Sequence, residues 1–247
     1  MGSNPTLSAS YAKATAGKPE GSWHRISMNN QTRETLDEEK KYYSVTKKFW
    51  AILAPFYDIM VLPVSRVRDR VVNLTEAKTG SIILDVATGT GEQAFTFAKR
   101  GYNVIGVDFS EAMLKVANRK NRYGNVKFEV ADATKLPFKA NSFDVACVSF
   151  ALHEMPLTIR EKALREMVRV TKPEGTIVVV DYALPGNRTA RFLIYHFVHL
   201  YEGAHYTKFI KADLDALLAK SGIEVKEKPP VLLGAGRIWK GIVTAGH

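Results

Sequence analysis

From residue 82 onward, short apolar runs alternate with stretches in which apolar residues recur every three or four positions. The runs Ile82–Asp85 and Val104–Asp108 are rich in β-branched residues, and each ends in an aspartate. Between them, residues 94–98 carry apolar side chains at helical spacing, and Gly101 suits a helix C-terminus. The pattern predicts a strand, a helix and a second strand, which form one βαβ unit of a parallel sheet.

The same alternation predicts further strands along the chain. These strands cover Val126–Val130, Val145–Phe150, Thr176–Asp181, Ile223–Lys228 and Arg237–Thr244. Lys172–Gly175 reads as a turn before the fifth strand, and Ala212–Lys220 as a helix capped at Gly222. We expect the last two strands to form a β-hairpin.

The N-terminal eighty residues follow a different pattern. Residues 1–36 lack periodicity, so we expect a mobile leader or tag-like segment. Residues 37–80 form a second region, in which helical spacing predicts one helix that ends at Pro55 and another that ends before Gly80. These helices either cover a sheet edge or act as a lid over a ligand.

Composition narrows the class of protein. A chain of 247 residues with 46% hydrophobic composition can bury a full core, and one domain with additions is expected. We see no apolar run of about 18 residues and no secretory signal. The single Cys147 lies in an apolar run, which favours a reduced, cytoplasmic setting.

The formal net charge of +10 raises the question of an anionic partner. The basic residues are spread along the chain without a run of five, so nucleic-acid binding is not expected. Attraction of the basic surface to an anionic membrane stays open, and RNA methylation stays an alternative.

The turn after the first strand, Ala87–Gly91, is rich in glycine and reads T-G-T-G. Such a loop lets a ligand approach the backbone, and Asp108 suits a ribose diol. The spacing also satisfies the loose dinucleotide pattern, so an NAD-dependent oxidoreductase remains an alternative. Asp85 favours another ligand, because its carboxylate would repel a pyrophosphate and attract a cationic amino acid moiety.

A series of motifs continues beyond this loop. In order, it comprises Asp85, Asp108, Asp132, Leu136–Phe138, Phe143–Asp144, Arg165–Met167, Arg169–Val170 and Lys172–Gly175. Over about Tyr42–Gly186 the chain resembles class I S-adenosylmethionine-dependent methyltransferases, and within them the branch that methylates ubiquinone and menaquinone precursors. The resemblance implies an α/β fold with a Rossmann-like, seven-stranded, mostly parallel sheet over residues 81–247 and a helical lid over 37–80.

The resemblance also implies S-adenosylmethionine as cofactor, with S-adenosylhomocysteine as product, and a set of binding residues. Phe109 and Met113 would flank the adenine, Asp132 would accept from its amine, and Ser110 would cap the following helix. The full expected set is Tyr57, Asp85, Ala87, Thr88, Gly89, Gly91, Asp108, Phe109, Ser110, Met113, Asp132, Ala133 and Ser149.

The chain departs from the quinone branch after the fourth strand, where His153–Glu154 replaces the common Arg-Asn pair. An imidazole at this position can take a proton near neutral pH, or it can simply hold a loop. His153 is the first candidate for a catalytic base and Tyr206 the second.

Residues 187–210 crowd aromatic and histidine side chains together, which predicts a segment that covers the substrate. The expected acceptor-contacting residues are Tyr43, His153, Tyr201, His205 and Tyr206. Since the histidines have no cysteine or acidic partners at familiar spacing, no metal is expected. We therefore predict methyl transfer to a small aromatic or lipophilic acceptor, while the methylated atom and the oligomeric state stay open.

Overall fold

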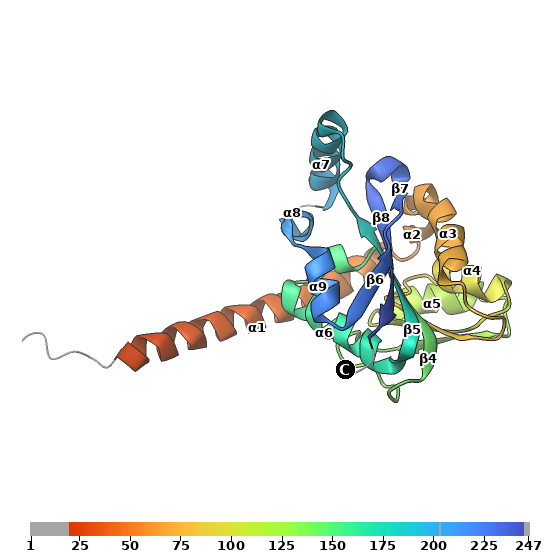
Figure 1. Cartoon of the computed structure of the whole chain (residues 1–247), viewed down its shortest axis with the longest axis horizontal. Coiled ribbons are helices and arrows are strands. Elements are labelled where there is room, and N and C mark those ends of the chain that lie inside the picture. Colours follow the sequence, from red (N-terminus) through yellow and green to blue (C-terminus); the bar gives the residue numbers. More distant parts are fainter. Residues whose placement is uncertain (1–19, 203, 245–247) are drawn as a thin grey trace, which may run out of the picture. The chain divides into compact units, whose positions relative to one another are not determined.

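The computed structural model describes the backbone of residues 20–202 and 204–244, and their side chains apart from 20–32, 63, 197, 200–202, 204 and 205 (Figure 1). The chain divides into two compact units, Met1–Lys40 and Lys41–His247. The first described helix, α1 (Glu20–Leu53), runs through this division. The sheet and both cavities described below belong to the second unit.

The N-terminal helices partly follow the prediction. Helix α1 begins at Glu20, well before the predicted start near Asp37. Its first half is mostly polar, and its few apolar residues form no long stripe from which a helix could be predicted. After Pro55 come α2 (Tyr57–Met60), the 3-10 helix η1 (Leu62–Val64) and α3 (Ser65–Thr75). Helix α3 lies where the sequence predicted the second helix, whereas α2 and η1 were not predicted.

One sheet organises the second unit, with strand order β3-β2-β1-β4-β5-β8-β6. The bounds are β1 Ile82–Val86, β2 Asn103–Asp108, β3 Val126–Val130, β4 Phe143–Ser149, β5 Thr171–Tyr182, β6 Ile223–Glu227 and β8 Gly236–Val243. Strands β1 to β5 pair in parallel, whereas β8 is antiparallel to both β5 and β6. The predicted mostly parallel sheet and the final hairpin are confirmed. The additional strand β7 (Pro230–Val231) pairs with β8 and was not predicted.

Helices cover both faces of this sheet. The remaining helices are α4 Glu92–Lys99, α5 Glu111–Lys120, η2 Leu152–Glu154, α6 Leu157–Val170, α7 Arg188–Glu202, α8 Ala204–Lys211, α9 Leu214–Lys220 and η3 Leu232–Gly234. Neighbouring residues of β1 point to opposite faces. Leu84 belongs to the core packed by α6 and α9, and Ile83 to the core packed by α3 and α4. The carboxyl ends of β1, β4 and β5 consequently meet at one edge between two helical layers.

The predicted turn before the fifth strand is instead an irregularity within β5. The pairing of β4 with β5 jumps from Phe143 opposite Thr171 to Val145 opposite Thr176. Glu174 takes a positive φ of 60° in this interval. The chain therefore turns locally, as the sequence predicted, while the strand assignment continues through it.

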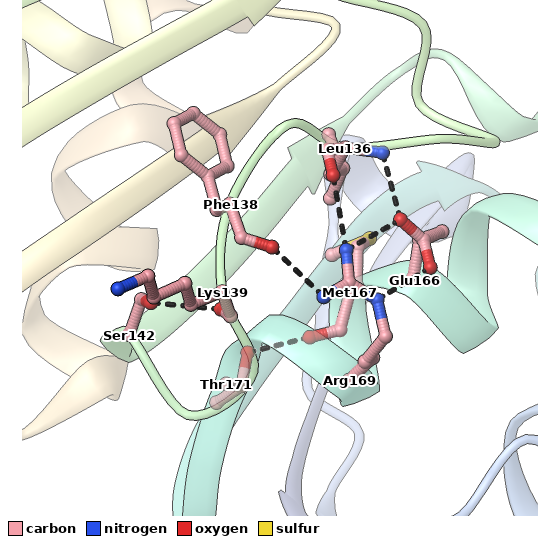
Figure 2. A network of polar contacts seen from close by, with 8 residues as sticks. All are labelled: Leu136, Phe138, Lys139, Ser142, Glu166, Met167, Arg169 and Thr171. Carbon is pink, nitrogen blue, oxygen red and sulfur yellow. Dashed lines mark hydrogen bonds and ion pairs between the residues drawn. The ribbon is translucent and has the colours of Figure 1, made fainter.

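A polar network fixes the loop that follows β3 (Figure 2). The guanidinium of Arg169 donates to the carbonyls of Phe138, at 2.8 Å, and Leu136, at 3.0 Å. It also pairs with Glu166, whose other oxygen accepts from the Leu136 N–H at 2.7 Å. This pairing lowers the pKa of Glu166. The network explains why the LPF and REMVR motifs occur together, since one holds the backbone of the other.

Candidate active site

The glycine loop between β1 and α4 has a backbone that few side chains tolerate. Ala87, Gly89 and Gly91 take φ values of 53°, 57° and 86°. A Cβ on Gly91 would lie 2.6 Å from the ring of Phe128, so a glycine is needed there for packing. A Cβ on Gly89 would lie 3.6 Å from the ring of Tyr57, which rests on the loop.

Asp108, the last residue of β2, is held by the backbone on both sides. One carboxylate oxygen accepts from the Gly89 N–H at 2.9 Å, and the other from the Ser110 N–H at 2.8 Å. The Ser110 hydroxyl accepts from Met113 N–H and begins α5, as predicted. Burial raises the pKa of Asp108 to about 6 although both hydrogen bonds favour its charged form.

The first of two cavities lies above β2 and β3, and we call it the β2–β3 cavity. Its lining comprises Tyr42, Tyr43, Thr46, Trp50, Tyr57, Ala87, Gly89, Val107, Asp108, Phe109, Met113, Ala131, Asp132, Ala133, Ser149, Phe150, Ala151, Glu154, Met155 and Ile159. It brings together most of the residues predicted to bind a cofactor. Of the predicted set that the structure describes, Gly91 and Ser110 line neither this cavity nor the next one.

The second cavity, of about 810 Å³, lies between α3, α7 and the ends of β4 and β5, and we call it the α3–α7 cavity. Its lining comprises Trp50, Tyr57, Met60, Val61, Val64, Val67, Arg68, Asp85, Ala87, Thr88, Thr90, Glu92, Gln93, Ser149, Phe150, His153, Glu154, Tyr182, Val198 and Leu232. Most of its walls are apolar. Of its charged residues, Asp85 and Glu92 flank the glycine loop, whereas Arg68 lies on α3 and Glu154 on η2.

Asp85 lies near the end of β1, just before the glycine loop, and lines the α3–α7 cavity. Its side chain accepts from the Thr88 hydroxyl at 2.5 Å. Burial raises its pKa to about 7, and the nearby Asp108 adds to this shift. A carboxylate that is only 1% exposed gains from a cation beside it, because the protein around it solvates the negative charge poorly.

Trp50 and Tyr57 line both cavities, so the two spaces adjoin at these rings. The Trp50 indole donates to Glu154 at 3.0 Å, and its ring meets that of Tyr57 edge-on. Sequence reasoning missed Trp50 and Glu154 as site residues. An aromatic residue in a predicted helix is typical of ordinary packing, and Glu154 belongs to no motif beyond its place next to His153.

A charged cluster ties α2 to the glycine loop. Asp58 accepts from the Thr90 hydroxyl at 2.5 Å and pairs with Lys120 at 2.6 Å. Lys120 also pairs with Glu92 at 2.7 Å. Asp58, the residue next to Tyr57, is thus held to the glycine loop and to α5, which fixes the Tyr57 ring over Gly89.

His153 forms a buried pair with Asp181, the next-to-last residue of β5. Its Nδ1 lies 2.8 Å from one Asp181 oxygen, and its backbone N–H donates to the other at 3.1 Å. The carboxylate selects the tautomer with hydrogen on Nδ1, so Nε2 carries the lone pair. Nε2 lies 3.9 Å from Glu154. Asp181 was missed as a site residue, although it stands at a strand end like the three predicted aspartates.

Two of the tyrosines predicted to contact the acceptor lie elsewhere in the structure. Tyr206 is fully buried, with its ring 5.5 Å from that of Tyr182, and it lines neither of the two cavities described. We assign it to packing and not to a catalytic role. Tyr43 lines the β2–β3 cavity, with its hydroxyl 3.4 Å from that of Thr134, and so lies away from the predicted acceptor side. The side chains of Tyr201 and His205 lie outside the described residues.

Comparisons with known proteins identify the family. The family described as "Methyltransferase domain" matches residues 83–175. The demethylmenaquinone methyltransferase of Paenarthrobacter aurescens is 41% identical over 138 residues, covering 54% of this chain and 53% of the relative. The ubiquinone/menaquinone biosynthesis C-methyltransferase UbiE of Idiomarina loihiensis is 32% identical over 180 residues, covering 66% of this chain and 71% of the relative. The chain belongs to the class I S-adenosylmethionine-dependent methyltransferases, in their UbiE-like branch.

Structural similarity supports the fold of this UbiE-like methyltransferase. A SAM-dependent methyltransferase from Aquifex aeolicus superposes with a TM-score of 0.58 at 21% identity, covering 72% of this chain and 89% of that one. The chain spans about half the length of the Paenarthrobacter relative. The predicted fold class and cofactor are confirmed, and membership of this family sets aside the NAD-dependent alternative.

Proposed function

We propose that this UbiE-like chain transfers a methyl group from S-adenosylmethionine to a small, flat, lipophilic acceptor. The observation that carries the proposal is the meeting of two unlike cavities at Trp50 and Tyr57. One cavity presents Asp108, which suits a ribose diol. The other presents the buried Asp85, which suits a cationic amino acid group. A molecule that carries adenosine at one end and methionine at the other fits across both.

The cofactor assignment follows from the donor and acceptor set. Asp108 accepts a single backbone hydrogen bond on each oxygen, so each oxygen retains a lone pair for a ribose hydroxyl. Phe109 and Met113 supply apolar surface for an adenine, and Asp132 supplies an acceptor for its amine. Gly91 and Ser110 act indirectly, because they shape the loop and hold Asp108.

The acceptor assignment rests on the walls of the α3–α7 cavity. Its far side is made by Val61, Val64, Val67, Val198 and Leu232, which offer no polar group beyond their backbone. Such a surface favours a lipophilic ring over a sugar, a nucleotide or a peptide. The relatives in ubiquinone and menaquinone biosynthesis point to the same class of acceptor.

His153 is the proposed base for an acceptor whose proton must leave. When bound, S-adenosylmethionine supplies a methyl group that is already strongly electrophilic. The chain therefore aligns the acceptor, excludes water and removes a proton. Asp181 holds the imidazole with Nδ1 protonated and would stabilise the imidazolium that forms when Nε2 takes a proton.

In this proposal the predicted N-terminal helical region, residues 37–80, acts as a lid from Lys41 onward. Asp58 joins α2 to Thr90 by a hydrogen bond and to Lys120 by an ion pair, which places Tyr57 over the loop where the cofactor would lie. Loss of these two contacts would open the junction of the two cavities to water, so a closed lid would protect the methyl donor.

The decisive experiment has two stages. First, S-adenosylmethionine, S-adenosylhomocysteine and NAD are each titrated into the protein while its melting temperature is followed. The first two should raise it by several degrees and NAD should not. Second, transfer of radiolabelled methyl is measured to substituted hydroquinones and to an RNA pool. Transfer of the labelled methyl group to a hydroquinone supports the proposal. A higher melting temperature with NAD, or labelling of RNA alone, refutes it.

A further inference from the structure

Five large apolar side chains stand exposed on the elements that line the α3–α7 cavity. Leu233 is 101% exposed, Ile59 70%, and Leu62, Phe192 and Leu193 62% each. We call these five residues the apolar rim. Each belongs to an element that also contributes to the cavity wall, namely α2, η1, α7 or η3. Figure 1 shows α7 and the loop that carries β7 rising from the same edge of the sheet.

Leu233 is the most informative residue of the rim. It adopts a φ of 54° and a ψ of 26°, the left-handed region that disfavours a leucine and suits glycine or asparagine. Its side chain is also fully exposed, so the fold gains nothing from packing it. A costly conformation combined with an exposed apolar side chain indicates a function outside folding. Its neighbour Leu232, by contrast, lines the cavity.

The described charges around the rim are mainly basic, and Asp58 of α2 is paired with Lys120 at 2.6 Å. Helix α3 carries three arginines against one aspartate, Asp69, and that aspartate pairs with Arg100 at 3.2 Å. Residues 184–199 carry Arg188 and Arg191, both exposed, and no acidic residue. Exposed apolar groups among arginines match an anionic lipid surface, where the apolar groups enter the acyl boundary and the cations remain among the headgroups.

We propose that the apolar rim docks this protein on an anionic lipid bilayer, with the mouth of the α3–α7 cavity facing the lipid. No described helix is long and apolar enough to cross a bilayer, so the contact is peripheral. An acceptor dissolved in the bilayer then enters the cavity between α2, α7 and η3 without crossing water. This docking goes beyond the proposed methyl transfer, since lipid binding is measured without cofactor or acceptor.

The test uses the full chain and sedimentation with vesicles. One set of vesicles contains phosphatidylcholine alone, and the other contains added phosphatidylglycerol. Wild-type protein should bind the anionic vesicles, bind phosphatidylcholine far more weakly, and lose binding at high salt. Leu62→Glu combined with Leu233→Glu should weaken binding by at least about tenfold, because two apolar anchors are lost and two repulsive charges are added.

A matched control is Leu157→Glu, the same substitution at a leucine of α6 that is 54% exposed and lies outside the rim. It should bind vesicles like the wild type. All variants should melt at similar temperatures, because the altered side chains are on the surface. Absence of vesicle binding, equal binding by the double variant, or equal loss in the control overturns the proposal. Concentration-dependent dimerisation that the double variant abolishes also overturns it, because a second copy would then cover the rim.

Discussion

The two cavities meet at Tyr57, yet they are built in different ways. The β2–β3 cavity is shaped by strand-end residues with backbone partners, of which Asp108 is the clearest case. The α3–α7 cavity is shaped by apolar side chains from four α-helices, two 3-10 helices and the ends of β4 and β5. Backbone-held geometry tolerates little change, whereas an apolar wall can accept substitutions of similar volume. We infer that the β2–β3 cavity and the Asp85 end of the α3–α7 cavity serve the shared cofactor, whereas the apolar wall of the α3–α7 cavity is free to vary with the acceptor.

The largest effect is expected at Gly89. Gly89→Arg forces a large side chain into a position with φ of 57° under the ring of Tyr57, where it would fill the β2–β3 cavity. We expect S-adenosylmethionine affinity to fall by about a thousandfold or more, measured by calorimetry. Gly124→Arg is the control, since no atom lies within 4 Å of its Cβ position. Normal cofactor binding by the Gly89 variant would show that the cofactor site lies elsewhere.

The next largest effect is expected at His153 and Asp181, which should matter for turnover and not for cofactor binding. His153→Ala and Asp181→Asn should each lower kcat by about a hundredfold and leave cofactor affinity unchanged, because the base lies on the acceptor side. Asp181→Asn should also shift the pH profile of kcat, since the amide cannot stabilise an imidazolium. Tyr206→Phe tests the packing role of that residue and should stay within about twofold of wild type. Equal losses in the tyrosine variant would reinstate Tyr206 as a base.

A smaller effect concerns stability on the β2–β3 side. Arg169→Ala leaves the carbonyls of Leu136 and Phe138 without their guanidinium donor. Urea unfolding should give a loss of about 2 kcal/mol in the free energy of unfolding. Arg165→Ala is the control, because its ion pair with Glu161 is exposed and long at 3.5 Å, and it should change stability by less than about 0.5 kcal/mol. Similar losses in both variants would refute the anchoring role of Arg169.

The smallest effect is a pH dependence of cofactor binding. Burial raises the pKa of Asp85 to about 7, so the carboxylate of the free protein becomes protonated as the pH falls through that value. A cationic ligand requires the ionised form, and affinity should be about tenfold weaker at pH 6 than at pH 8 by calorimetry. Asp85→Asn should bind weakly with a much flatter profile. An unchanged profile in this variant would mean that Asp85 does not face the ligand.

The raised pKa values also determine how the stability of the fold changes with pH. Because the folded-state pKa values of Asp85 and Asp108 lie above those of an unfolded chain, these groups make the free protein less stable as the pH rises from about 4 to 7. Cofactor binding should offset this loss above pH 7.

The sequence predicted the sheet well because periodicity reports burial. Strands such as Val126–Val130 and the strand that begins at Ile82 were predicted to within one or two residues. The start of α1 was not, since the first half of this helix is mostly polar and has no long run of apolar residues at helical spacing. The aspartates at strand ends were predicted from motifs, whereas Asp181 belongs to no such motif and its role depends on His153, which lies 28 residues away in the sequence.

The acceptor side was harder to predict for a physical reason. Residues such as Val64, Val198 and Leu232 are far apart in the sequence and share only an apolar character, which also describes any core residue. Tyr206 illustrates the opposite error, since an aromatic residue in a crowded segment suggested a site and was buried in packing instead. Only tertiary structure distinguishes a cavity wall from a core.

Among the described strands β8 comes last in chain order, yet it lies inside the sheet between β5 and β6. During synthesis, β6 leaves the ribosome before β8, the strand that connects β6 to the rest of the sheet. The nascent chain must therefore hold the edge of β5 unpaired until β8 emerges, and during that interval it presents a site for chaperones or for aggregation.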